Sequence, residues 1–209
     1  MCYIQKKLRL ISFLIALAIG PIACQNKEDK VYRQALSADR MAINEQFFDP
    51  KETPLDSNHF NGFKGLKFFP INENFKVTAQ LTLLQNQSIF ELPHSHDKTR
   101  PYKNYALAKF SWEGENYALL ILEQAEKKPG NENYLLLPFT DVTNGQTTYG
   151  GGRYIDLEKK ANQTEITIDF NTAYNPYCAY NAKYTCPIPP KENHLPIAME
   201  AGMKYEMNK

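Results

Sequence analysis

A glycine-rich segment between Asp141 and Asp156 has the residue types of an anion-binding site. Three successive glycines, 150–152, lead directly into Arg153. Glycine suits positions that need a positive φ or a close approach by another group, and the N–H groups of such a loop can bind an anion beside a guanidinium. The same pattern is also typical of a glycine bend at a sheet edge, with Arg153 paired to Asp141 or Asp156. A P-loop ending and a GxGxxG motif are both missing.

Two cysteines, Cys178 and Cys186, follow in a segment rich in Tyr and Asn. An even pair of cysteines in an oxidising compartment favours a disulfide. Reactive thiols are an alternative, because Lys183 and the neighbouring Tyr and Asn residues make a polar setting. Metal binding with His194 is a third, although Cys-x7-Cys is not a zinc-knuckle spacing. We predict the disulfide, with no metal and no cofactor.

The stretch His94-Ser95-His96-Asp97 also has metal-ligating residue types. Two imidazoles at i and i+2 of a strand would share a face and could chelate a metal. However, Pro93 precedes them and the segment has the composition of a loop, so we expect a solvated loop. The serine-nucleophile motif GxSxG and the zinc motif HExxH are both absent from the sequence.

These segments together suggest a pocket for a small polar or anionic ligand, since Tyr and Asn offer stacking and hydrogen bonds. The candidate ligand-binding residues are Arg100, Tyr102, Asp141, Tyr149, Gly150, Gly151, Gly152, Arg153, Tyr154, Asp156, Asn171, Tyr174 and Asn175. One alternative is a hydrolase with Asp141 or Asp156 as acid or base and Arg153 as electrostatic stabiliser, or a thiol-dependent enzyme at Cys178. Another is a purely structural protein.

The elements that must position these residues are mainly strands. Residues 31–48 have an apolar stripe at helical spacing and end before Pro50. After Pro54 the apolar residues form short runs, several of them alternating, and a Gly-containing loop joins two of these runs as in a hairpin. The predicted strands are 75–83, 106–112, 117–122, 134–139, 153–157 and 164–170.

No long helix separates these strands, which favours an antiparallel sheet over parallel βαβ units. We therefore predict a mainly β, α+β domain over residues 31–205. Its sheet curls into a sandwich or partly open barrel, with one N-terminal helix. Residues 171–199 are rich in Pro, Tyr and Asn, and we expect them to run extended over the surface.

The charge of the chain excludes a nucleic-acid binder. The chain has 209 residues, with 24 Lys and Arg against 23 Asp and Glu. Residues 1–23 contain three of the basic residues and none of the acidic ones, so the remainder has a net charge of −2. Binding to nucleic acid requires a concentrated basic face. The 13 Tyr and 12 Phe indicate a folded domain rather than a disordered chain.

The N-terminus has the organisation of a signal peptide. Lys6, Lys7 and Arg9 precede an apolar run that is too short to span a membrane. The sequence Gly-Pro-Ile-Ala-Cys, ending at Cys24, resembles the lipobox of bacterial lipoproteins, with Pro21 where Leu is usual. An uncleaved anchor helix or an ordinary signal peptide is the alternative.

The lipobox resemblance implies that residues 1–23 are removed and that Cys24 is acylated. The polar residues 24–30 would then form a tether between the lipid and the domain. Several acyl chains, at about 0.8 kcal/mol per buried methylene, would anchor the protein firmly to a membrane. We expect it in the cell envelope, facing the periplasm, and Gln25 after the cysteine slightly favours the outer membrane. Protein partners cannot be assigned from the sequence.

Three motifs carry a further resemblance, TDVTNGQTTYGGGRYIDL, IDFNTAYNPYCAY and TCPIPPKENHLPIAMEAG. Together they resemble the bacterial and archaeal family called domain of unknown function 1684, over roughly residues 31–205. The Arg100-x-Tyr102 pair fits the same pattern. The resemblance implies positions of interest and no activity. The family includes apparently cytoplasmic members with a similar cysteine pair, in which a disulfide would be unexpected.

Overall fold

The computed structural model describes residues 20–206 of the chain, with side chains from residue 27 onward. The chain divides into two units after Ile43, and each is considered by itself. The first consists of most of helix α2 (Gly20–Phe48). This helix begins before Val31, where the apolar stripe predicts its start, and residues 24–30 are part of it. No helix in the described part combines the length and apolarity needed to cross a membrane.

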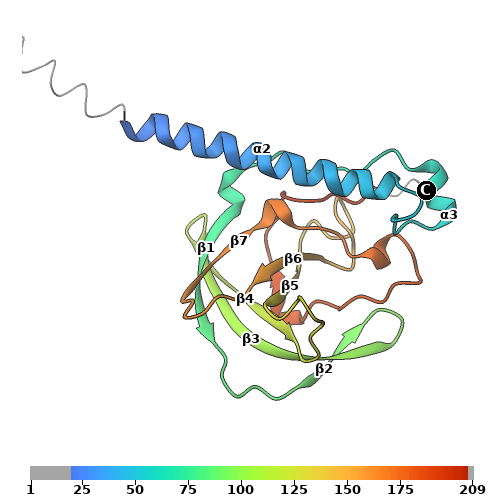
Figure 1. The fold of residues 1–209 in the computed structure, drawn as a ribbon. Coiled ribbons are helices and arrows are strands. Elements are labelled where there is room, and N and C mark those ends of the chain that lie inside the picture. The colour runs from blue at the N-terminus through green and yellow to red at the C-terminus, as the bar shows by residue number, and fades with distance from the viewer. Residues whose placement is uncertain (1–19, 207–209) are drawn as a thin grey trace, which may run out of the picture. The chain divides into compact units, whose positions relative to one another are not determined.

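The second unit, residues 44–209, contains a mainly antiparallel sheet that curls into a nearly closed barrel (Figure 1). Its hydrogen-bonded order is β6-β5-β4-β3-β1-β7, with β2 added to β3 and β8 to β5. The strands are β1 (Lys76–Leu83), β2 (Phe90–His94), β3 (Lys98–Trp112), β4 (Glu115–Gln124), β5 (Tyr134–Asp141), β6 (Arg153–Glu158), β7 (Glu165–Asp169) and β8 (His194–Leu195). The predicted mainly β, antiparallel architecture is confirmed.

The hairpin predicted from the Gly-containing loop is also confirmed. Strands β3 and β4 pair from Tyr102 with Gln124 to Trp112 with Glu115. The turn residues Glu113 and Gly114 have φ of 50° and 84°, and two successive positive φ angles match the right-handed twist of a hairpin. Strand β3 begins at Lys98, well before the predicted start at Ala106. Its first residues pair with β2, a strand that the alternation pattern did not reveal.

The interior of the barrel is the main hydrophobic core. Buried aliphatic and aromatic side chains from β1, β3, β4, β5, β6 and β7 fill it, among them Leu119, Leu137 and Ile155. Met199 and Ala201 of the C-terminal segment join this core and are 0% exposed. The segment 171–199 therefore does not simply lie on the surface as expected. It has no α-helix, but it buries apolar side chains because they complete the barrel core.

Three short 3-10 helices interrupt this segment, η2 (Phe170–Thr172), η3 (Tyr177–Ala179) and η4 (Lys191–Asn193). Asn193 is 0% exposed and fixes η4 to the sheet. Its side chain accepts from the Leu120 N–H at 2.7 Å and donates to the carbonyls of Leu120 at 2.8 Å and Pro138 at 2.7 Å. Asn193 thus takes the place of a strand residue beside β4 and β5. Two further helices precede the sheet, α3 (Ser57–Gly62) and η1 (Glu73–Phe75).

Successive residues of a strand point to opposite faces of the sheet. Strand β6 shows this directly, since Arg153 and Ile155 are buried toward the interior while Tyr154 and Asp156 face outward. A second apolar cluster covers the outward face of β3, β4, β5 and β6. We call it the outer cluster, and it consists of Phe90, Leu92, Tyr102, Leu120, Leu122, Tyr134, Leu136, Tyr154, Tyr174, Cys178, Tyr184 and Cys186.

Candidate functional site

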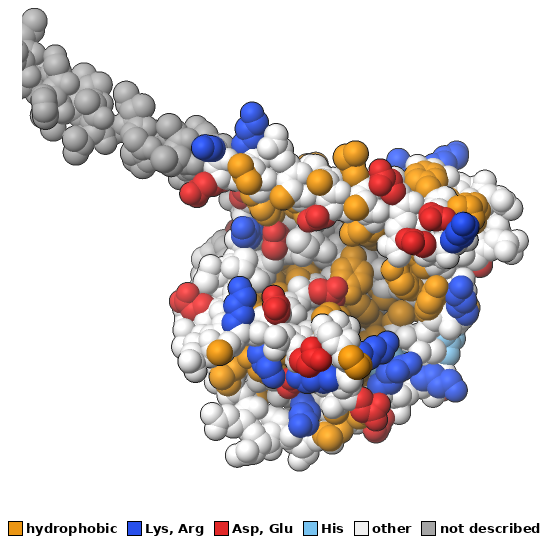
Figure 2. Space-filling model, viewed as in Figure 1, with side chains coloured by type: hydrophobic (Ala, Val, Ile, Leu, Met, Phe, Trp, Pro, Cys, Tyr) orange, Lys and Arg blue, Asp and Glu red, His pale blue; other side chains and the backbone are white. Residues whose placement is uncertain are grey.

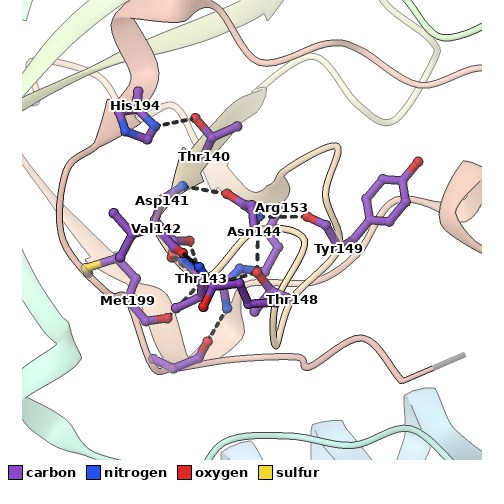
Figure 3. A network of polar contacts seen from close by, with 12 residues as sticks. Thr140, Asp141, Val142, Thr143, Asn144, Thr148, Tyr149, Arg153, His194 and Met199 are labelled. Carbon is purple, nitrogen blue, oxygen red and sulfur yellow. Dashed lines mark hydrogen bonds and ion pairs between the residues drawn. The ribbon is translucent and has the colours of Figure 1, made fainter.

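The loop between β5 and β6 satisfies its polar side chains internally (Figure 3). The Asp141 carboxylate accepts from the Thr143 N–H at 2.8 Å and from the Thr143 hydroxyl at 2.5 Å. The Thr143 and Thr148 hydroxyls bond to one another at 2.8 Å. The Asn144 amide donates to the Tyr149 carbonyl at 2.7 Å and accepts from the Asp141 N–H. The loop is therefore a closed hydrogen-bonded unit that directs its polar groups inward.

Arg153 lies at the centre of this unit and is 0% exposed. Its guanidinium donates to the Asp141 carboxylate and to the Met199 carbonyl, both at 2.8 Å, and also to the Ala201 carbonyl. Burial lowers the pKa of Arg153 from its ordinary value, and the Asp141 carboxylate opposes that shift. The anion site expected at Arg153 loses its support, because the charge is neutralised inside the protein. The alternative, an ion pair with Asp141, is what the structure contains.

The glycines of this loop have packing reasons of their own. Gly152 has a φ of +92°, and a Cβ there would lie 2.7 Å from the Phe139 carbonyl oxygen. A Cβ on Gly151 would lie 2.5 Å from the Tyr149 ring. A Cβ on Gly150 would meet its nearest neighbour, the Gly145 backbone, at 3.7 Å, which is an ordinary van der Waals contact. Two of the three glycines therefore permit close contacts within the protein, which agrees with a glycine bend and gives no indication of a bound anion.

Asp156 lies on the other face of β6 and has no ion pair with Arg153. Its Oδ1 accepts hydrogen bonds from the Tyr134 hydroxyl at 2.9 Å and from the Tyr174 hydroxyl at 2.7 Å. Asp156 itself is exposed, whereas the two tyrosines are half-buried. Two phenols from different segments thus hold one carboxylate oxygen. A hydrolytic site that joins Asp141, Arg153 and Asp156 is not formed, because the first two side chains are buried on the opposite face.

Asp156 lies at the edge of the outer cluster, which brings together five tyrosines from strands β3, β5 and β6 and from the segments after η2 and η3. Burial is the main cause that raises the pKa values of Tyr134, Tyr154 and Tyr174, so these phenols stay protonated and act as donors at neutral pH. The Tyr154 hydroxyl donates to the Pro187 carbonyl. Figure 2 shows hydrophobic side chains in a recessed area over the middle of the viewed face of the molecule, with charged side chains below them.

The two cysteines are neighbours in this cluster and both are free thiols. The structure therefore does not contain the expected disulfide. The Cys178 N–H donates to the Cys186 sulfur at 3.3 Å. Cys186 is 9% exposed and Cys178 is half-buried. Seven residues separate the two cysteines along the chain. The helix η3, which includes Cys178, begins the turn that brings them together.

The environment of Cys178 stabilises its thiolate. The hydrogen bond from Cys186 lowers the pKa of Cys178 to about 7, and hydrogen bonds from Ser95 and Tyr149 act in the same direction, against the effect of burial. The pKa of Cys186 is raised, first by its hydrogen bond to Cys178 and then by burial. Burial and the proximity of Cys178 raise the pKa of Tyr149 to about 12. The glycine loop and the cysteine segment therefore meet at Tyr149 and Cys178.

The remaining predicted residues have other positions. Asn171 is 1% exposed, accepts from the Asn72 N–H at 3.0 Å and donates to the Asn72 carbonyl at 2.8 Å. Asn175 is buried and donates to the Lys204 carbonyl at 2.9 Å. Both fix the backbone and offer no surface for a ligand. Arg100 is exposed near the start of β3, whereas Tyr102 is buried in the outer cluster.

Three residues of this region were not predicted from the sequence. Tyr134 begins a run of residues that is apolar on both faces, so no alternation indicates the face on which its side chain lies. Ser95 and His94 fall in the stretch expected to be a solvated loop, yet His94 is only 3% exposed and contacts the Leu92 carbonyl at 3.0 Å. Burial lowers the pKa of His94, which keeps the ring neutral. The turn consists of Ser95, His96 and Asp97, and the last two have φ of 59° and 52°.

Comparison with known proteins agrees with this fold. Residues 61–204 match the family described as protein of unknown function (DUF1684), and the chain belongs to that family. A similar solved structure is the uncharacterized protein from gene locus rrnAC0354 of Haloarcula marismortui, determined by solution NMR. It is 31% identical, with a TM-score of 0.69 over 88% of this chain and 100% of that chain. No curated protein matches the chain in sequence.

Proposed function

We propose that this protein is a lipid-anchored protein of the cell envelope that binds a small polar ligand at Asp156. The observation that carries the binding site is the tethering of an exposed carboxylate by two phenols. Both bonds, from Tyr134 at 2.9 Å and Tyr174 at 2.7 Å, end on Oδ1. The second oxygen, Oδ2, has capacity to accept from a ligand, and its direction is fixed by the two phenols.

The chemistry of this position favours a ligand with hydrogen-bond donors. A carboxylate accepts from hydroxyl or amine groups, and the half-buried rings of Tyr134 and Tyr174 add apolar surface beside it. An anionic ligand is not favoured here, because Arg153, the cation on which that expectation depended, is buried on the opposite face. A neutral sugar or polyol combines hydroxyl donors with an apolar face and fits both features.

The proposed anchor is supported by the N-terminal sequence. Basic residues, an apolar run and a lipobox-like sequence precede Cys24. Acylation of Cys24 would attach the protein to a membrane without a spanning helix. In the mature protein, helix α2 would then continue directly from the acylated residue toward the domain.

Binding is tested by isothermal titration calorimetry and NMR with glucose and N-acetylglucosamine as neutral probes and citrate as an anionic probe. We expect a sugar to bind and to shift the ring signals of Tyr134 and Tyr174. Asp156→Asn should weaken that binding about tenfold or more. Glu158→Gln is the matched control, because it removes the same charge from the same outward face of β6 and should leave binding unchanged. The proposal would be contradicted if both variants weakened sugar binding equally, or if the protein bound citrate and neither sugar.

The anchor is tested separately by mass spectrometry of the mature protein. We expect its first residue to be Cys24 with acyl groups, and the protein to be recovered with membranes. Cys24→Ala should prevent acylation and cleavage at this position. A mature protein that begins at another residue, or that carries an unmodified Cys24, would overturn the anchor without affecting the ligand site.

A further inference from the structure

Cys178 and Cys186 form a pair whose two members differ in accessibility and in hydrogen bonding. Cys178 is half-buried, whereas Cys186 is buried at 9% exposure. The Cys178 N–H donates to the Cys186 sulfur at 3.3 Å, which places the two cysteines next to one another. In thiol–disulfide exchange, an accessible thiol attacks an external disulfide, and a second thiol nearby then resolves the mixed disulfide. The unequal exposure and the proximity of Cys178 and Cys186 suit these two roles.

Three further hydroxyls, those of Ser95, Tyr149 and Tyr205, lie near the Cys178 sulfur. Those of Ser95 and Tyr149 lower the pKa of Cys178, and the proximity of Cys178 raises the pKa of Tyr205. Ser95 comes from the turn after β2, and Tyr149 from the glycine loop between β5 and β6. Donors from separate parts of the chain therefore converge on one sulfur, and they favour its deprotonated form.

The supporting structure holds Cys186 in place. Its N–H donates to the Ser95 hydroxyl at 3.0 Å, and its carbonyl accepts from the Ser95 N–H at 2.9 Å. Two residues further along both segments, the Ile188 N–H donates to the Pro93 carbonyl at 2.8 Å. The Cys186 segment is thus fixed to the end of β2 from both sides, while Cys178 lies in the short helix η3 next to the exposed Tyr177.

From this geometry we propose that Cys178 and Cys186 are a thiol–disulfide exchange site that accepts electrons from, or donates them to, small thiol and disulfide compounds. The Cys178 thiolate attacks one sulfur of an external disulfide, forms a mixed disulfide and releases one thiolate. Cys186 then loses its proton and attacks the Cys178 sulfur, which releases the second thiolate. The external disulfide is reduced to two thiols, and the cysteine pair is oxidised to an internal disulfide.

The proposal is independent of ligand binding at Asp156, since none of its groups takes part in tethering that carboxylate. It also accounts for the free thiols of the structure and for the disulfide that an even pair of cysteines suggests, because these would be the two states of one couple. The order of attack follows from exposure, as an external compound can reach Cys178 and not the buried Cys186.

The test uses the full chain with Cys2→Ser and Cys24→Ser, purified in detergent, so that only the pair provides thiols. Reduced protein is mixed with oxidised glutathione, and products are followed by mass spectrometry. We expect an internal Cys178–Cys186 disulfide with little mixed disulfide. Cys186→Ser should accumulate glutathione on Cys178. Cys178→Ser should react at least tenfold more slowly, because Cys186 is buried.

Further variants distinguish an effect on reactivity from an effect on folding. Tyr149→Phe and Ser95→Ala retain both thiols and should slow the attack by Cys178 severalfold, whereas Tyr184→Phe, also in the outer cluster, should leave the rate unchanged. Near-ultraviolet circular dichroism of each variant checks that it is folded. Equal rates for the two single cysteine variants, or persistent mixed disulfide in the protein with both cysteines, would overturn the proposal.

Discussion

Arg153 and Asp141 form an ion pair of 2.8 Å in which neither side chain is exposed to solvent. The pair joins the last residue of β5 to the first residue of β6 across the glycine loop. Through the Met199 and Ala201 carbonyls, Arg153 also holds the C-terminal segment against the barrel. Arg153 and Asp141, which look most like functional residues in the sequence, therefore have a structural role.

Loss of one partner of this pair should destabilise the domain strongly. Arg153→Met removes the guanidinium and leaves the Asp141 carboxylate buried and uncompensated, which costs about 3–5 kcal/mol in comparable cases. Urea unfolding monitored by circular dichroism measures the loss. The double variant Arg153→Met with Asp141→Leu should recover part of that stability, because no charge is then buried. An Arg153→Met protein as stable as wild type would show that the pair contributes little.

The three glycines of the loop should differ sharply in their tolerance of alanine. Gly152→Ala places a Cβ 2.7 Å from the Phe139 carbonyl at a φ of +92°, and we expect a loss of about 2 kcal/mol or more. Gly150→Ala meets nothing closer than 3.7 Å and should change stability by less than about 1 kcal/mol. Thermal unfolding of the two variants gives the comparison. Similar losses at both positions would contradict the packing explanation for Gly152.

Asn193 should be sensitive to a change that removes only its amide. In Asn193→Ala, three backbone groups of Leu120 and Pro138 lose a partner, and each unsatisfied buried group costs about 1–3 kcal/mol. We expect a loss of about 3 kcal/mol or more in chemical unfolding. Asn133→Ala, at an exposed position just before β5, is the control and should stay within about 0.5 kcal/mol of wild type.

The fold could be predicted largely because its strands follow the binary pattern. The hairpin of β3 and β4 was evident from two apolar runs around a Gly-containing turn, and the absence of long helices between strands indicated antiparallel pairing. Strand β2 was not predicted, because Pro93 and two histidines obscure its short alternation of apolar and polar residues. The start of helix α2 was missed because residues 25–30 are polar and lack the stripe that marks the rest.

The site could be predicted only in part, because residue type does not reveal which face a side chain occupies. Arg153 and Asp156 lie in one strand, yet an odd separation of three places them on opposite faces. The expected pocket combined residues from both faces and so could not form as one site. Tyr149 does lie near Cys178, and Tyr174 does contact Asp156. Their further neighbours Ser95 and Tyr134 are distant in sequence, and neither was a candidate site residue.

The reactivity of Cys178 should rise with pH through a midpoint near neutrality. Its pKa is lowered to about 7, mainly by the hydrogen bond from Cys186, so the thiolate is a minor form at pH 5.5 and the major form at pH 8.5. Because the thiolate is the nucleophile, we expect the rate of alkylation by iodoacetamide to increase through pH 7 and level off above pH 8. Cys186, whose pKa is raised, should react much more slowly throughout.

The measurement uses the chain with Cys2→Ser and Cys24→Ser, and peptide mass spectrometry assigns the alkylated residue. The ionisable groups that face the Cys178 sulfur are Cys186, Tyr149 and Tyr205, and both phenols remain neutral over this pH range because their pKa values are raised. Cys186→Ala removes the principal donor, so the midpoint should move upward toward that of an ordinary thiol, about 8.5. A midpoint unchanged in that variant would mean that Cys186 does not stabilise the thiolate.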